Sequence, residues 1–99
     1  MVLYDSNVYL KLSVQRALFG NVTPNIRAVV AELSGKNISL LFYFDGQIDD
    51  DDKELVSVIE TEIIADFDED FTVDTTVKRL DPPQPIKNKN GLLIYIRKE

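Results

Sequence analysis

The sequence contains no cysteine and no histidine. The absence of cysteine excludes disulfides, thiol nucleophiles and cysteine-ligated metals. The absence of histidine excludes Ser-His triads, histidine-ligated metals and imidazole acid–base catalysis. No apolar run approaches the ~18 residues of a transmembrane helix, and the N-terminus lacks the basic start and cleavage site of a signal peptide. These absences predict a small cytoplasmic binding protein that does not associate with membranes.

Motifs for catalysis or cofactor binding are missing as well. The four glycines are scattered singly, so the chain has no glycine-rich phosphate loop. The carboxylates occur as charge runs, without the contrast in environment that divides acid from base roles. An EF-hand counted from Asp45 would need glycine where Asp50 stands and glutamate where Val56 stands. The sequence therefore predicts no enzyme, no cofactor and no metal site.

The chain has the length of one domain. Of its 99 residues, 44% are hydrophobic and 28% are charged, which is an ordinary globular composition. Two domains would each be too small to support a hydrophobic core. We therefore expect a single domain over residues 1–99.

Negative charge is concentrated in the middle of the sequence. The net charge is −6, and residues 45–74 hold thirteen of the seventeen acids, with Lys53 as their single base. Such a field repels the phosphates of nucleic acids. It attracts a basic surface and speeds association with it. The expected partner is therefore a basic protein and not a nucleic acid.

The apolar pattern predicts two helices and four strands. An apolar residue at every fourth position from Leu55 to Phe67 marks the clearest helix. Alternation from Val8 to Val14 would suit a strand, but the good helix formers before Gly20 favour a helix there. The expected elements are helices at 6–19 and 49–67, strands at 26–33, 37–44, 71–80 and 92–97, and a loop at 88–91. This α-β-β-α-β-β order is typical of an α+β fold in which two helices pack on one face of a mostly antiparallel four-stranded sheet.

Four adjacent aspartates begin the second predicted helix. An Asp N-cap stabilises a helix by about 1 kcal/mol, and acids in the first turn add a few tenths. Capping accounts for Asp49 and Asp52 in this way. Because adjacent carboxylates repel one another, capping does not require Asp50 and Asp51.

A second acidic cluster follows at the C-terminal end of that helix, where the macrodipole disfavours negative charge. Its members are Asp66, Asp68, Glu69 and Asp70. Two explanations stay open. The internal one pairs these acids with basic residues of the later strands, which are Lys78, Arg79, Lys87 and Lys89. The external one presents them to a basic partner, since the two acidic clusters would lie roughly 25 Å apart, near the width of a standard interface.

Strand alternation predicts an exposed face on the other side of the sheet. The expected core-facing residues are Ile38, Leu40, Phe42, Phe44, Leu92, Ile94 and Ile96. The opposite face would then show Leu41, Tyr43, Leu93, Tyr95 and Arg97 together if the two strands lie close. Tyrosine and arginine are enriched at interface hot spots, although they also decorate solvated sheets.

The candidate partner-binding residues come from both surfaces. The acids are Asp50, Asp51, Glu54, Glu62, Asp66, Asp68, Glu69 and Asp70, and the apolar anchors are Tyr43 and Tyr95. The alternative is a regulatory or adaptor domain that binds a cellular protein through the sheet face. That alternative includes a homodimer formed through the strand edge at 92–96.

Three stretches of the chain resemble a small bacterial protein family. They are RALFGNVTPNIRAV at residues 16–29, FYFDG at 42–46 and IYIRKE at 94–99. By size, acidity and lack of catalytic residues, the chain is similar in type to the immunity proteins of contact-dependent growth inhibition and related toxin systems. That resemblance implies a protein that binds and neutralises a cationic toxin domain, a nuclease, with carboxylates that mimic phosphates. It assigns no individual functional residue.

Overall fold

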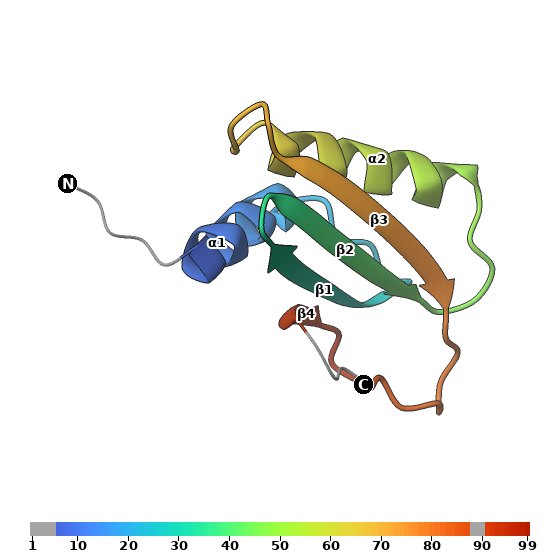
Figure 1. Ribbon diagram of the computed structural model, residues 1–99. Helices are drawn as coiled ribbons and strands as arrows, with labels where there is room; N and C mark the ends of the chain where they lie inside the picture. Colours follow the sequence, from blue (N-terminus) through green and yellow to red (C-terminus); the bar gives the residue numbers. More distant parts are fainter. Residues whose placement is uncertain (1–5, 88–90) are drawn as a thin grey trace.

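The computed structural model describes residues 6–87 and 91–99 (Figure 1). Its elements are α1 (Ser6–Leu18), β1 (Ile26–Ser34), β2 (Asn37–Phe44), α2 (Asp50–Ile64), β3 (Thr72–Arg79) and β4 (Leu92–Ile96). This order confirms the predicted α+β fold. The second helix is shorter than predicted, since it ends at Ile64. Of the loop predicted at 88–91, residues 88–90 lie outside the described part of the chain.

The four strands form one sheet in the order β3-β2-β1-β4. β1 pairs antiparallel with both β2 and β4, whereas β2 and β3 are parallel. A parallel pair needs a crossover connection, and α2 supplies it. The sheet is therefore mostly antiparallel, as predicted, with β3 and β4 at its two edges.

Both helices pack on the same face of the sheet and enclose the core. α1 contributes Leu10 and Val14, and α2 contributes Ile59 and Ile63, all fully buried. From β2, the core receives the whole set expected from alternation, namely Ile38, Leu40, Phe42 and Phe44. The opposite face of the sheet has no helix on it in the described structure.

Local signals set the helix ends. α1 stops before Gly20, whose φ of 79° favours glycine, and the Asn21 side chain donates to the carbonyl oxygen of Ala17 at 2.8 Å. α2 begins with a capping box, in which the Asp49 side chain accepts from the backbone N–H of Asp52 and the Asp52 side chain accepts from that of Asp49. Asp49 and Asp52 therefore have the capping role that the sequence predicts.

The prediction for the two faces of β4 is wrong in its second half. Val29 of β1 lies opposite Tyr95, but Val30 lies opposite Leu93, so Ile94 is an extra residue in the pairing. Such a bulge reverses the alternation beyond it. Tyr95 consequently packs against the core, while Ile96 turns outward and is 57% exposed. Tyr43 and Tyr95 lie on opposite faces of the sheet.

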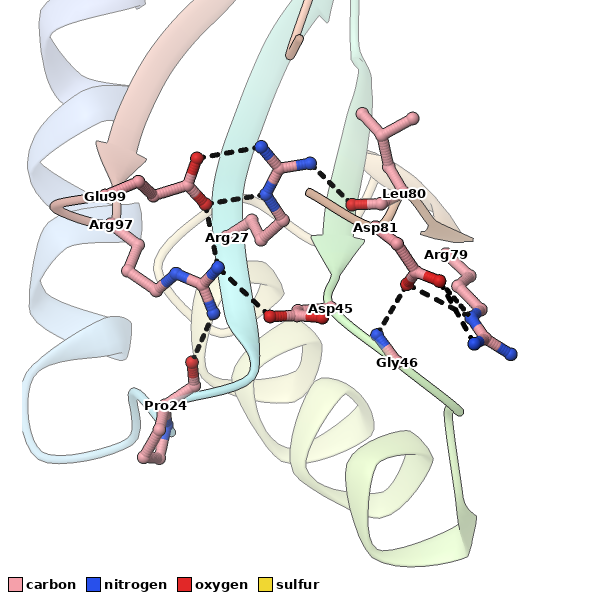
Figure 2. Close-up of polar contacts among 9 residues, drawn as sticks. All are labelled: Pro24, Arg27, Asp45, Gly46, Arg79, Leu80, Asp81, Arg97 and Glu99. Carbon is pink, nitrogen blue, oxygen red and sulfur yellow. Dashed lines mark hydrogen bonds and ion pairs between the residues drawn. The ribbon is translucent and has the colours of Figure 1, made fainter. Parts of the chain in front are cut away.

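A buried arginine holds together the end of the sheet at which β1 begins (Figure 2). Arg27 is 3% exposed. Its Nε and Nη2 donate to the two carboxylate oxygens of Glu99 at 2.6 and 2.8 Å, and its Nη1 donates to the carbonyl oxygen of Leu80. The bidentate bond with Arg27 is the main cause that lowers the pKa of Glu99 from 4.5 to about 2.

Arg97 belongs to the same polar cluster rather than to the exposed sheet face predicted for it. Its guanidinium donates to Asp45 at 3.1 Å, to Glu99 at 2.8 Å and to the carbonyl oxygen of Pro24 at 2.8 Å. The side chain is 22% exposed. The change of face follows from the bulge in β4, which precedes Arg97 by three residues.

Candidate functional site

The first acidic cluster is exposed on the first two turns of α2. The side chains of Asp50, Asp51 and Glu54 point to solvent, and among the described residues none of them makes an ion pair or a hydrogen bond. The adjacent Asp52 differs, because it is 8% exposed and accepts from Asn25 Nδ2 at 2.9 Å. Three carboxylates at this end of α2 are therefore available to a partner.

The second acidic cluster lies in the turn after α2 and divides into two pairs. Asp68 and Glu69 are exposed, with no ion pair or hydrogen bond from either side chain in the part of the chain that the structure describes. Asp66 and Asp70 instead form ion pairs with Arg16 and Lys36. Internal pairing thus explains half of the cluster.

The bases that pair with this cluster are not the predicted ones. Arg16 comes from α1 and Lys36 from the turn between β1 and β2, whereas the predicted bases belong to later strands. Arg79 pairs with Asp81. Among the described residues Lys78 and Lys87 form no ion pair, and Lys89 lies outside the described residues. Because α2 ends early, its last turn is followed by a loop that reaches toward α1 and the β1–β2 turn.

Asp66 connects this turn to α1. Its carboxylate accepts from Ser13 Oγ and from Arg16 Nη2, both at 2.6 Å, and its carbonyl oxygen accepts from the Tyr9 hydroxyl. The bond from buried Ser13, followed by the bond and the charge of Arg16, lowers the pKa of Asp66. Asp66 is therefore a structural residue that positions the exposed acids beside it.

Replacing Asp66 with alanine is expected to lower the free energy of unfolding by about 1–2 kcal/mol, because hydrogen bonds to a charged group are lost. The lowered pKa adds a pH dependence to this loss. The stabilisation is complete above 3.8, the usual pKa of aspartate, and it disappears as the pH falls through the lower pKa of the folded state. Urea denaturation of both proteins at pH 7 and pH 3 measures it. The matched variant Glu69→Ala should be neutral, and an equal loss in both variants would contradict the role given to Asp66.

Glu62 and Asp70 complete the set of predicted acids. Glu62 lies on the exposed side of α2 between the two clusters, where it accepts from Asn21 Nδ2 at 3.3 Å. The Lys36 ammonium is the main cause that lowers the pKa of Asp70. Both partners of that ion pair are more than half exposed, so the pair contributes little to stability.

Tyr43 lies apart from the acids, on the face of the sheet that the helices leave uncovered. It is half-buried and stands opposite Ala28 of β1 and Lys78 of β3. On the same face, Leu93 is 42% exposed and Ile96 is 57% exposed. We call this surface, formed by Leu41, Tyr43, Leu93 and Ile96, the open face.

A third surface was not predicted from the sequence. α1 exposes Val8 and Leu12, each at 46%, and Phe19 just beyond its end is 89% exposed. A groove of about 400 Å³ lies beside Phe19, and Ile94 and Tyr95 of the edge strand β4 line it. The spacing of residues 8, 12 and 19 places them on one side of a helix, and this second apolar stripe was the signal that could have revealed the surface.

In the described part of the chain, no three acidic side chains are close enough together to hold a metal ion. Neither α1 nor α2 is long and apolar enough to cross a membrane.

Residues 7–99 match the family described as MafI2 immunity protein. The chain belongs to this immunity-protein family. The match spans every surface described above, including both acidic clusters and the open face. It confirms that the chain is of the immunity-protein type predicted from the sequence, and it makes a toxin the partner that the family implies. No individual curated protein matches the chain.

Proposed function

We propose that this immunity protein neutralises a cationic nuclease toxin domain of a contact-dependent growth inhibition system or a related system, by binding it rather than by catalysis. One observation supports the choice of a cationic partner. Five exposed carboxylates at the two ends of α2 make no ion pair or hydrogen bond with the described residues, and they are Asp50, Asp51, Glu54, Asp68 and Glu69. The macrodipole favours the acids in the first turn of α2, but it does not favour Asp68 and Glu69 beyond the end of the helix.

The arrangement of these acids suits a nucleic-acid-binding cleft. A nuclease binds phosphates through clustered lysine and arginine, so carboxylates held on a rigid helix can occupy the same positions. From Asp51 to Ile64 the helix rises by about 20 Å at ~1.5 Å per residue, and the second cluster follows in the turn beyond it. That span matches one side of a standard interface. Long-range attraction would also speed capture of the toxin.

Coexpression with the gene immediately upstream, taken as the candidate toxin gene, tests the function. The toxin alone should stop growth, and the immunity protein should restore growth and co-purify with the toxin. The double variant Asp51→Lys/Glu54→Lys should associate with the purified toxin domain at least about tenfold more slowly at low salt. Its association rate should also depend less on salt concentration, because two attractive charges have become repulsive.

The matched control is Glu32→Lys/Asp74→Lys, which changes the net charge equally on the uncovered side of the sheet. At physiological ionic strength, where charges are screened beyond about 8 Å, its association rate should stay within about twofold of wild type. If the product of that gene neither stops growth nor binds this protein, the two genes are not a toxin–immunity pair. Equal rates for wild type and for the α2 variant would remove the acidic clusters from the interface.

The second candidate function is that of an adaptor which binds a cellular protein, or a second copy of itself, through the sheet. The exposure of Leu93 and Ile96 on the open face favours it, as does the outer edge of β4, which pairs with no strand among the described residues. An adaptor should affect the cell without the toxin gene, whereas an immunity protein should be dispensable there. If the open face is the interface, the Glu32→Lys/Asp74→Lys control is the variant that binds slowly.

A further inference from the structure

A small pocket opens where the N-terminal end of α1 meets the turn after α2. It has a volume of about 330 Å³, and its walls include Tyr9, Leu33, Phe67, Phe71 and the two acids Asp66 and Asp68. We propose that this pocket receives one arginine side chain of the toxin. The inference rests on the proposed function, which makes the toxin the source of the arginine. It adds one specific contact to the general attraction between the acidic clusters and a basic partner.

Three aromatic rings form the apolar part of the pocket. The ring centroids of Tyr9 and Phe67 are 5.1 Å apart and nearly perpendicular, at 80°. Those of Phe67 and Phe71 are also 5.1 Å apart, with an angle of 46°. All three side chains are half-buried, so parts of their rings border the pocket. An aromatic face carries negative electrostatic potential and attracts a planar guanidinium more than it attracts a neutral group.

The carboxylates of the pocket differ in what they can still bind. Asp66 already accepts from Ser13 and Arg16. Asp68 is exposed and has no ion pair or hydrogen bond from its side chain in the described structure. No basic side chain is among the described residues of the pocket wall, and Lys36 nearby in the sheet turn pairs with Asp70. The pKa of Lys36 is raised mainly by Asp70, and the charge of Asp68 contributes a smaller part. A cation from outside would therefore bind the Asp68 carboxylate without breaking an ion pair or a hydrogen bond among the described residues.

The pocket is large enough to receive one long side chain. Sites for drug-sized ligands span about 300–1,000 Å³, so this pocket is at the small end and open on one side. An arginine combines an apolar stem, which would lie against Leu33 and the rings, with a charged plane that reaches Asp68. A glutamate or an aspartate would face the same carboxylates and be repelled.

Nuclear magnetic resonance titration with Nα-acetyl-arginine amide tests the pocket without the toxin. The backbone amide signals of Phe67, Asp68 and Phe71 should shift and approach saturation at millimolar concentrations. The citrulline analogue has nearly the same shape without the charge, and it should shift these signals at least about fivefold less at equal concentration. Asp68→Asn should weaken binding of the arginine compound severalfold, whereas the neighbouring Glu69→Gln should leave it unchanged.

Equal shifts for the arginine and citrulline compounds, or signals that do not move, would overturn the proposal that the pocket binds arginine. That conclusion would hold even if the toxin binds elsewhere on the protein. A lysine compound that binds as tightly as the arginine compound would overturn the choice of arginine. The pocket could bind the arginine compound while Asp68→Asn leaves the affinity for the toxin unchanged. That result would overturn the proposal that the toxin supplies the arginine. Failure of the proposed function is seen separately, as a neighbouring gene product that is harmless and does not bind.

Discussion

Replacing Arg27 with methionine is expected to lower the melting temperature by about 10 °C. The guanidinium is buried, and it is the shared partner of the Glu99 carboxylate and the carbonyl oxygen of Leu80. Methionine has a similar length but no donors, so both acceptors lose their bonds from Arg27, and Glu99 keeps only the bond from Arg97. Each lost hydrogen bond to a charged group costs about 1.5–3 kcal/mol, and small domains lose several degrees per kcal/mol. Thermal unfolding followed by circular dichroism measures the change.

The same variant should change the titration of Glu99. In the folded protein the pKa of Glu99 is lowered from 4.5 to about 2, with Arg27 as the main cause and Arg97 as the next cationic partner. A lowered pKa gives a stabilisation that is complete above pH 4.5 and is lost as the pH falls toward 2. In Arg27→Met the pKa should rise toward 4.5 without reaching it, because Arg97 still donates to Glu99.

A second variant separates the ion pair from a general loss of packing. Glu99→Gln removes the negative charge, so adding Arg27→Met to it should cost less than Arg27→Met costs in the wild type. Equal costs in the two backgrounds would show that Arg27 acts through packing alone. An unchanged melting temperature in Arg27→Met would contradict the role given to the polar cluster.

The sequence predicted the elements of this fold because their apolar patterns are local. Apolar residues recur at every fourth position in α2 and at every second position in β2, because one side of each element is buried. Phe42 and Ile59 could therefore be assigned to the core from the sequence. The end of α2 could not be predicted in this way. Phe67 continues the fourfold repeat, but it lies beyond the helix, where its ring packs against Tyr9 and Phe71. An apolar side chain can satisfy the repeat from a turn as well as from a helix.

Residues that depend on distant partners were harder to assign. Arg27 is buried because Glu99 reaches it from 72 positions away, and no local pattern contains that information. The faces of β4 were predicted from strict alternation, which a single extra residue at Ile94 reversed. Tyr95 was therefore placed on the wrong side.

The acids of the candidate site were recognised as a set but not distinguished within it. Charge density marks Asp66 and Asp68 equally, and only the position of α1 shows that Ser13 and Arg16 engage the first of them. The same geometry leaves Asp68 at the mouth of an aromatic pocket. Sequence composition therefore leads only to the expectation of a basic partner, whereas the distinction between structural and available carboxylates required the fold.

Replacing Phe42 with alanine is expected to lower the free energy of unfolding by about 4 kcal/mol, the cost of a large cavity in a core. Phe42 is fully buried and stands in the central strand β2, between Val29 of β1 and Val77 of β3. Because it faces the helices, neighbouring strands and helices lose contacts together. A domain of this size has only about 5–15 kcal/mol of stability, so much of the margin disappears. Urea denaturation at 25 °C measures the loss.

Leu41, next to Phe42 in the sequence, is a matched control because its side chain lies on the other face of β2. Leu41 is half-buried on the open face, opposite Val30 of β1, so Leu41→Ala should cost about 1 kcal/mol or less. Equal costs at the two positions would contradict the two-faced sheet. In cells, Phe42→Ala should weaken immunity by reducing the amount of folded protein, and raising its expression should restore protection. Asp51→Lys/Glu54→Lys should instead weaken immunity mainly through slower capture of the toxin. Lysines near the helix N-terminus oppose the macrodipole and cost about 1 kcal/mol together, so this variant should unfold cooperatively at a urea concentration much closer to wild type than Phe42→Ala does.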